Sequence, residues 1–267
     1  METVSECYAK WLELLRLTET IQEGVLWIGG GVSVFDVTAL AELDFLQDRA
    51  LYDFLVERFL TPNNMLDDPL AILSSISVEE DDNKRGELFE DFIFSCSTLL
   101  GFSTRSRAGP RERGTSLSYQ SNKGGGDLVL LSHFPIHTAS TEFEGCALAC
   151  EAKSTEGQVG SKAVGQARNL KAKIEETYHN YLVYPIIVSR AKFGYDGSGR
   201  DLAPPEVVLL TQDSLLEICK QQKERLERGD RLVLPVHVMA MIEELIRLQN
   251  LEPSIYHIKS ILGSIVK

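Results

Sequence analysis

Two short apolar runs bordered by charged residues constrain the fold more than any other feature of this chain. Residues 128–131 (LVLL) follow Asp127, and residues 146–150 (CALAC) are followed by Glu151-Ala152-Lys153. Apolar runs of this length are typical of buried strands, whose side chains alternate between the two faces of a sheet. We therefore expect Glu151 and Lys153 on one face of a strand and Ala152 on the other.

If the two runs pair as neighbouring strands, Asp127 joins Glu151 and Lys153 at one edge of the sheet. Two carboxylates and one ammonium group at one place are what a hydrolytic Mg²⁺ site requires, because hard divalent cations prefer carboxylate oxygens. A lysine at that distance can position a water molecule and offset charge on a phosphate. The 15-residue connection 131–145 is long for a hairpin, so direct pairing of the two strands is left open.

Composition and charge limit the class of protein. The chain has 267 residues, 43% of them hydrophobic and 25% charged, which is typical of a soluble globular protein. No apolar run approaches the length of a membrane span and the N-terminus lacks a signal-peptide pattern, so we expect a cytoplasmic protein. The five cysteines form no Cys-x-x-Cys pair, which favours reduced core thiols over a zinc site. The net charge of −12 argues against bulk attraction to nucleic acid, so any such contact must be local or assisted by a partner.

The N-terminal third of the chain predicts a separate, mainly helical region. Apolar residues recur at helical spacing through residues 1–80, interrupted at residues 24–35 by a glycine-rich piece that suits a small hairpin. Residues 79–84 (EEDDNK) form an acidic run suited to a linker. We therefore place a boundary near residue 82, with region 1–82 serving recognition of a partner or of DNA and region 83–267 forming the second domain.

A helix and a basic loop are predicted after this boundary. Residues 86–102 carry one apolar stripe with Gly101 placed to end the helix, and Glu87, Glu90 and Asp91 crowd its first turns, either as solvated charges or with one of them at a metal. Residues 103–123 contain five cations and one acid, which indicates a phosphate-contacting segment or, alternatively, a plain surface loop. These cations are Arg105, Arg107, Arg111, Arg113 and Lys123.

The C-terminal half predicts alternating helices and strands. We expect helices at 163–178, 214–228 (with Ser214 and Glu217 as a capping box), 236–248 and 254–265, and strands at 180–188 and 207–210. Pro185 suggests that its strand is an edge strand or carries a bulge. In and next to the first of these helices, a second basic cluster lies within 20 residues of Lys153 and is made of Lys162, Arg168, Lys171 and Lys173.

The order of these features resembles the PD-(D/E)xK nuclease superfamily, which has the restriction-endonuclease-like fold. The matching elements are a helix with acids in its first turns, Asp127 at a strand start, Glu151-Ala152-Lys153 at a strand end, and a helix with Gln166 near its start. Gly126 stands where the name-giving motif has proline. The resemblance covers roughly residues 86–212 and is closest to FokI-type and Mrr-type cleavage domains. It implies an α/β fold with a mixed central sheet flanked by helices.

The resemblance also implies roles for individual residues. Asp127 and Glu151, with the carbonyl of Ala152, would bind Mg²⁺ or Mn²⁺, and Lys153 would act on the attacking water. The match favours Glu90 over Glu87 as an additional carboxylate, and Gln166 is either a supporting residue or a local cap. Phosphates of the DNA backbone would be held by Arg105, Arg107, Arg111, Arg113, Lys123, Lys162, Arg168 and Lys171.

The function expected from the sequence is therefore that of a metal-dependent DNA endonuclease. The acidic composition favours a restriction or defence-system cleavage subunit that acts as a dimer or with a partner supplying sequence recognition. One alternative is a non-catalytic interaction module that keeps a nuclease-like fold. Another is a nuclease that acts on RNA or on branched or single-stranded DNA.

Overall fold

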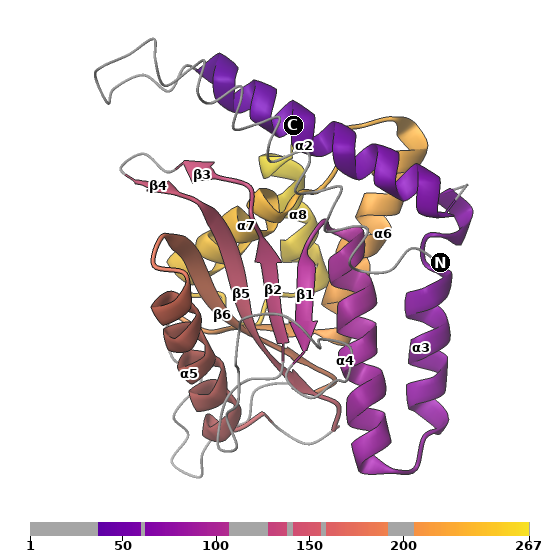
Figure 1. Cartoon of the computed structure of the whole chain (residues 1–267). Helices are drawn as coiled ribbons and strands as arrows, with labels where there is room; N and C mark the ends of the chain where they lie inside the picture. The colour runs from indigo at the N-terminus through magenta and orange to yellow at the C-terminus, as the bar shows by residue number, and fades with distance from the viewer. Residues whose placement is uncertain are drawn as a thin grey trace.

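The computed structural model describes residues 37–59, 62–106, 128–137, 141–155, 159–191 and 206–266 (Figure 1). The elements along the chain are α2 (Val37–Phe59), η1 (Pro62–Asn64), α3 (Asp67–Val78), α4 (Asp82–Leu99), β1 (Ser103–Ser106), β2 (Leu128–Ser132), β3 (Ile136–His137), β4 (Glu142–Phe143), β5 (Gly145–Lys153), α5 (Ser161–Thr177), β6 (Tyr181–Ser189), β7 (Val208–Thr211), α6 (Gln212–Arg228), α7 (Pro235–Arg247) and α8 (Ile255–Ile265).

The centre of the molecule is a mixed five-stranded sheet in the order β1-β2-β5-β6-β7. The β1–β2 and β2–β5 pairs are antiparallel, whereas β5–β6 and β6–β7 are parallel. The pairing of the two apolar runs, left open by the sequence, is direct: Leu128 pairs with Cys150 and Ser132 with Cys146. The long connection between them carries the small β3–β4 ribbon, which accounts for its length. The predicted α/β class with a mixed sheet is confirmed.

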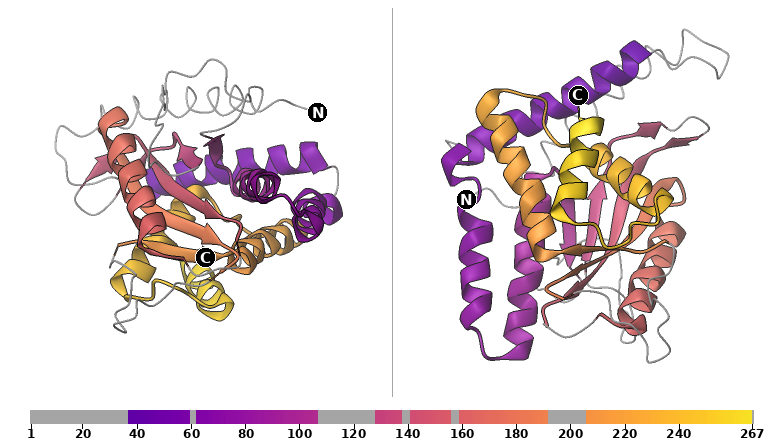
Figure 2. Two further views of the ribbon diagram at one scale, coloured as in Figure 1. Left: turned by 90° about the horizontal axis from the view of Figure 1, so that it is seen from below. Right: turned by 180° about the vertical axis from the view of Figure 1, so that it is seen from behind.

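Helices cover both faces of this sheet (Figure 2). The even-numbered side chains of β5, such as Leu148 and Cys150, belong to a large core shared with α4, α6, α7 and α8. The odd-numbered ones, Ala147 and Ala149, pack instead against Leu170 and Ile174 of α5. The alternation of side chains along β5 therefore sorts its residues between two helical layers.

The described part of the N-terminal region is helical, as predicted. Leu51 and Leu55 of α2 and Ile76 of α3 join the same large core as α4, and α3 lies alongside α4 (Figure 1). The predicted boundary near residue 82 falls in the short turn between α3 and α4, where Asp81 caps α4 by accepting hydrogen bonds from the backbone N–H groups of Asn83 and Lys84. Residues 24–35, which suit a hairpin, lie outside the described residues.

Three local predictions are wrong in detail. Ser103–Ser106, predicted as loop, forms strand β1 because its backbone pairs with β2. Helix α6 is capped by Thr211, whose Oγ1 accepts from the backbone N–H of Ser214, so Ser214 is not the cap residue. Strand β6, predicted to be an edge strand or to carry a bulge, lies between β5 and β7, and its register with β5 is unbroken at Pro185, opposite Ala149; its pairing with β7 starts only at Ile186.

Two expectations from composition concern the state of the cysteines and the presence of a membrane-spanning helix. Cys96, Cys146, Cys150 and Cys219 are buried and free, in agreement with reduced core thiols, and Cys7 lies outside the described residues. Within the described ranges, no helix has the length and apolar character needed to cross a membrane.

Candidate active site at the end of strand β5

The last residues of β5 carry a carboxylate and an ammonium group that touch. Glu151 Oε1 lies 2.5 Å from Lys153 Nζ, and the side chains are 1% and 32% exposed, respectively. Both residues lie on the α5 face of the sheet, because they are two positions apart in the strand, as predicted. Exposed Glu–Lys pairs contribute little to folding stability and are usually solvated. Here, in contrast, the carboxylate of Glu151 is removed from water.

The burial of Glu151 follows from its place in the sheet. Strand β5 lies between β2 and β6, and Glu151 is in register with Ile187 of β6. Ile187 in turn packs with Ala163 and Ala167 of α5, so Glu151 lies under the first turns of that helix. A buried carboxylate is costly unless it is paired or ligated, and a position that keeps one there is a candidate functional site.

Asp127, the second predicted acid, lies outside the described residues. Its covalent neighbour Leu128 pairs with Cys150, the residue immediately before Glu151. Leu128 and Cys150 both belong to the large core on one face, while Val129 belongs to the α5 face. Strand β2 therefore begins beside the residue that precedes Glu151 in β5.

The acids of α4 differ in their surroundings. Glu87 is exposed, whereas Glu90 is half-buried. Gly86, one helical turn before Glu90 on the same side of α4, faces the end of β5: a methyl group added there would lie 3.9 Å from Ser154 Oγ. The first turns of α4 thus approach the residues that follow Lys153, although α4 packs on the face of the sheet opposite to Glu151.

Helix α5 has two distinct flanks beside its buried face. The β7-side flank carries Arg168 and Lys171, which are ion-paired with Glu206 and Glu175, respectively. Glu206 precedes β7 by two residues, so this flank looks away from β5. The β5-side flank consists of Lys162, Gln166, Asn169 and Lys173.

Gln166 lies on the flank nearest the buried carboxylate. Its neighbour Ala167 packs against Ile187, the register partner of Glu151, and Gln166 Oε1 is buried. Asn169 was not selected from the sequence, although its spacing of three residues from Gln166 and seven from Lys162 could have identified it. Of the predicted phosphate-binding residues on this helix, Lys162 shares the flank of Gln166, and Arg168 and Lys171 do not.

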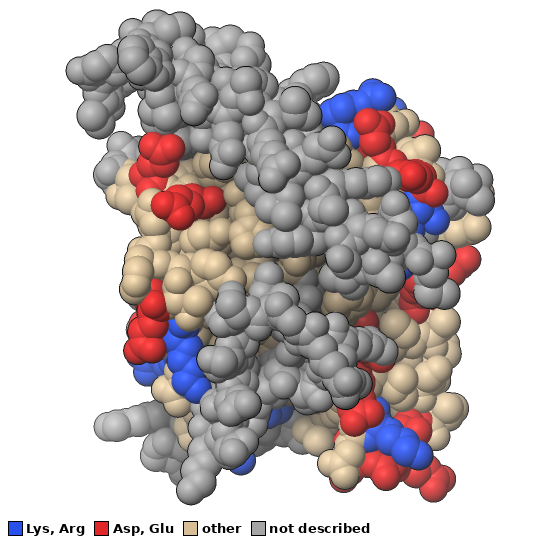
Figure 3. Space-filling view, in the orientation of Figure 1, with Lys and Arg blue, Asp and Glu red and all other residues tan. Residues whose placement is uncertain are grey.

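Most of the predicted basic loop lies outside the described residues. Arg105 lies in β1, where its backbone pairs with Val129. Its companions Arg107, Arg111, Arg113 and Lys123 lie outside the described residues. On the face seen in Figure 3, lysine or arginine atoms over α5 lie beside acidic atoms, acidic atoms lie over the β3–β4 ribbon, and groups of both charges lie at the right of the view.

The donor chemistry at the end of β5 suits Mg²⁺ or Mn²⁺. Carboxylate oxygens and a backbone carbonyl, such as that of Ala152, are the ligands these ions prefer. Among the described residues no group of three or more His, Cys, Asp or Glu side chains gathers into a metal site. Within that part of the chain, Glu151 is the candidate metal ligand because its carboxylate is buried at the end of a strand.

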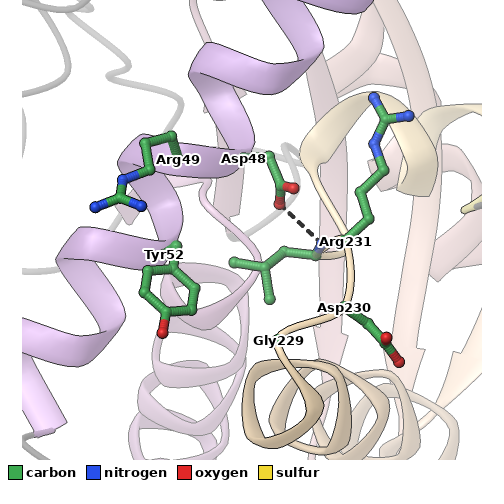
Figure 4. Close-up of a pocket in the computed structure, with 7 residues that line it drawn as sticks. Asp48, Arg49, Tyr52, Gly229, Asp230 and Arg231 are labelled. Atoms are coloured by element: carbon green, nitrogen blue, oxygen red, sulfur yellow. Dashed lines mark hydrogen bonds between the residues drawn. The ribbon is translucent and has the colours of Figure 1, made fainter.

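A hollow lies away from this site, between α2 and the segment that joins α6 to α7. It has a volume of about 520 Å³ and is lined partly by Asp48, Arg49, Tyr52 and Arg231 (Figure 4). Burial raises the pKa of Asp48, whose Oδ1 accepts a hydrogen bond from the backbone N–H of Leu232 at 2.8 Å. The guanidinium groups of Arg49 and Arg231 point away from each other, so the lining does not converge on one ligand.

No protein-family model matches the chain, and a search of the curated proteins finds no match to it.

Proposed function

We propose that this chain is a metal-dependent endonuclease that hydrolyses phosphodiester bonds of DNA. The observation that carries the proposal is the contact between Glu151 and Lys153, in which the carboxylate is 1% exposed and sits where an interior strand ends. A carboxylate kept out of water beside an ammonium group suits a site that binds a divalent cation and a phosphate.

The order of the elements supports the restriction-endonuclease-like fold as the finer description. Helix α4 is followed by the three antiparallel strands β1, β2 and β5, then by α5 and the parallel strand β6. This is the order in which the PD-(D/E)xK resemblance places its helix, its Asp strand, its Glu-x-Lys strand and its second helix. In this order, Glu151 lies at the end of β5, next to the start of β2.

The roles of the residues follow from their chemistry. Glu151 and Asp127 would hold the metal ion with the carbonyl of Ala152, and Glu90 would contribute through water. When bound, the ion would acidify a water molecule and neutralise charge on the phosphate. Lys153 orients the attacking water and donates a hydrogen bond to a phosphate oxygen, because its ammonium group is held beside the carboxylate. Gln166, on the overlying helix α5, would help to position the carboxylate of Glu151.

The acidity of the chain bears on how it finds its substrate. A protein of net charge −12 has little general attraction for DNA, so we infer that it acts as a homodimer or with a partner that supplies affinity and sequence choice. The described helices of the N-terminal region and the C-terminal helices are the candidate surfaces for that partner. A monomer that cuts a defined DNA site unaided at ordinary salt would contradict this inference while leaving the chemistry intact.

The proposal is tested by incubating the purified full-length protein with supercoiled plasmid and Mg²⁺ or Mn²⁺. We expect nicked or linear product in both metals, and EDTA should abolish it. The variants Asp127→Asn and Lys153→Met should each reduce the rate by about 100-fold or more, equivalent to about 3 kcal/mol of transition-state stabilisation. An RNA transcript of the same sequence provides the comparison arm for substrate class.

The outcome of this assay separates the alternatives. Equal product from the wild type and both variants, or no cleavage under any condition with any partner, would favour a non-catalytic interaction module. Cleavage of the transcript but not of the plasmid would favour a ribonuclease.

A further inference from the structure

We propose that Ser189, the last residue of β6, is a positioning residue that fixes the end of β5 and, through it, the ammonium group of Lys153. This inference rests on the proposed function and deepens it, because it assigns to the site a residue of the neighbouring strand. Ser189 acts through Lys153 and does not touch the substrate, because it is 0% exposed.

The carboxyl ends of three adjacent parallel strands form a polar row on the α5 face of the sheet. Lys153 of β5 is in register with Ser189 of β6, and Ser189 is in register with Thr211 of β7. One row earlier, Ile187 and Leu209 are buried together with residues of α5. Strands β6 and β7 therefore change from apolar to hydroxyl side chains on this face at their last residues. In open α/β sheets, ligands bind outside the carboxyl ends of the strands, so this row borders the place where a substrate would lie.

Ser189 shapes the turn that ends β6. Its Oγ accepts a hydrogen bond from the backbone N–H of Ala191 at 2.9 Å. A serine hydroxyl bonded to the backbone two residues later stabilises a tight turn. Within this turn, the backbone N–H of Arg190 donates to the carbonyl of Lys153 at 3.1 Å and closes the pairing of β5 with β6 at its last residue. The backbone of Lys153 is therefore held by a turn that Ser189 stabilises.

The same turn is anchored under helix α5. Ala191 is 9% exposed and belongs to the buried cluster that contains Ala163 and Ala167. The hydrogen bond from Ala191 to Ser189 is buried as well. Without the serine oxygen, the N–H of Ala191 loses its partner away from water, which is unfavourable enough to change the conformation of the turn.

A fixed backbone matters for Lys153 because its ammonium group ends a flexible hydrocarbon stem. The carboxylate of Glu151 holds one end of this side chain, at 2.5 Å from Nζ, and the strand holds the other. Ser189 lies beside the base of the stem, since residues in register on neighbouring strands are about 4.8 Å apart. A displacement of about 1 Å at a reacting centre can lower a rate by about 100-fold, so a looser strand end would slow the reaction.

The test compares Ser189→Ala, which removes the oxygen, with Ser189→Thr, which keeps it, in the full-length chain. Acetylation of Lys153 by N-hydroxysuccinimidyl acetate is followed by mass spectrometry, with the exposed Lys220 as internal reference. We expect Lys153 to react about 5-fold faster in Ser189→Ala than in the wild type, because the strand end opens more often. Plasmid cleavage in Mg²⁺ should fall about 10-fold at saturating DNA, with the half-saturating DNA concentration changed by less than about 2-fold. Ser189→Thr should stay within about 2-fold of the wild type in both assays.

The control for the loss of a buried serine oxygen is Ser214→Ala. Ser214 is 1% exposed, and its Oγ accepts from Thr211 Oγ1 at 2.9 Å, at the start of α6. We expect wild-type labelling of Lys153 and wild-type cleavage for this variant. Ser189→Cys fills the same space with a weaker acceptor and should repeat the pattern of Ser189→Ala, so the test holds even where the alanine variant does not fold.

The labelling and the cleavage results separate this inference from the proposed function. Unchanged labelling of Lys153 in Ser189→Ala and Ser189→Cys, equal changes in Ser214→Ala, or no rescue by Ser189→Thr would overturn the positioning role. Faster labelling of Lys153 in Ser189→Ala, in a protein whose wild type does not cleave DNA, would support the positioning of Lys153 and contradict the proposed function alone.

Discussion

The variant Glu151→Gln is expected to lose DNA cleavage by about 100-fold or more while keeping the fold. Glutamine has nearly the shape of glutamate, so the packing between β2, β6 and α5 is preserved. It lacks the negative charge that would hold a divalent cation and fix the ammonium group of Lys153, which lies 2.5 Å away. A loss of 100-fold corresponds to about 3 kcal/mol, a reasonable magnitude for removing a metal-binding carboxylate. Plasmid nicking in Mg²⁺ measures the rate, and thermal unfolding measures the stability.

The matched control for this variant is Glu227→Gln. Glu227 is also paired with a lysine, since its Oε1 lies 2.6 Å from Lys223 Nζ, but the pair lies on an exposed part of α6. We expect the control to keep the wild-type cleavage rate. Cleavage by Glu151→Gln at the rate of this control would exclude Glu151 from the reaction.

The largest effect on stability is expected from Gln222→Leu. The Gln222 side chain is 0% exposed and joins three segments. Its Nε2 donates to the carbonyl of Leu99 at 3.1 Å and to that of Val233 at 3.0 Å, and its Oε1 accepts from the backbone N–H of Val233 at 2.7 Å. Leucine leaves these buried backbone groups without their partner, which should cost about 3 to 5 kcal/mol of unfolding free energy.

The neighbouring residue provides the control for that prediction. Gln221 is half-buried, and its amide Nε2 is buried with no hydrogen-bond partner. Gln221→Leu should therefore change the unfolding free energy by less than about 1 kcal/mol, or raise it. Urea unfolding at pH 7 measures both variants. Equal destabilisation by the two substitutions would show that the Gln222 hydrogen bonds do not hold α4, α6 and the segment before α7 together.

Elements with strong local signals could be predicted from the sequence. Helix α5 was expected at 163–178 and spans Ser161–Thr177, because its apolar spacing is regular. Helix α8 follows Ser254, which caps it by accepting from the backbone N–H of His257. The pairing of Glu151 with Lys153 followed from the period of a strand, which places alternate residues on one face.

Features that depend on distant segments could not be predicted. The short segment Ser103–Ser106 has no apolar pattern and becomes a strand only because β2 offers a free edge to its backbone. The same limit applies to the cations of α5. Arg168 and Lys162 look equivalent in sequence, and only the position of Glu206, near β7, shows that Arg168 faces away from β5.

The depth at which Glu151 is buried also lies beyond local reasoning. It results from parallel pairing of β5 with β6 and from the cover that α5 provides over Ile187. An apolar run ending in Glu-x-Lys is equally compatible with a solvated pair at the end of an edge strand. The central claim of our account therefore concerns a distance between side chains and not a pattern of residues.

That claim is that the carboxylates of Asp127 and Glu151 bind one divalent cation, and it is tested most directly in crystals of the full-length protein soaked with Mn²⁺. The account predicts an anomalous-scattering peak within about 2.3 Å of a carboxylate oxygen of each residue, on the α5 face of the sheet. Carboxylates on opposite faces of the sheet, or too far apart to share the ion, would contradict it.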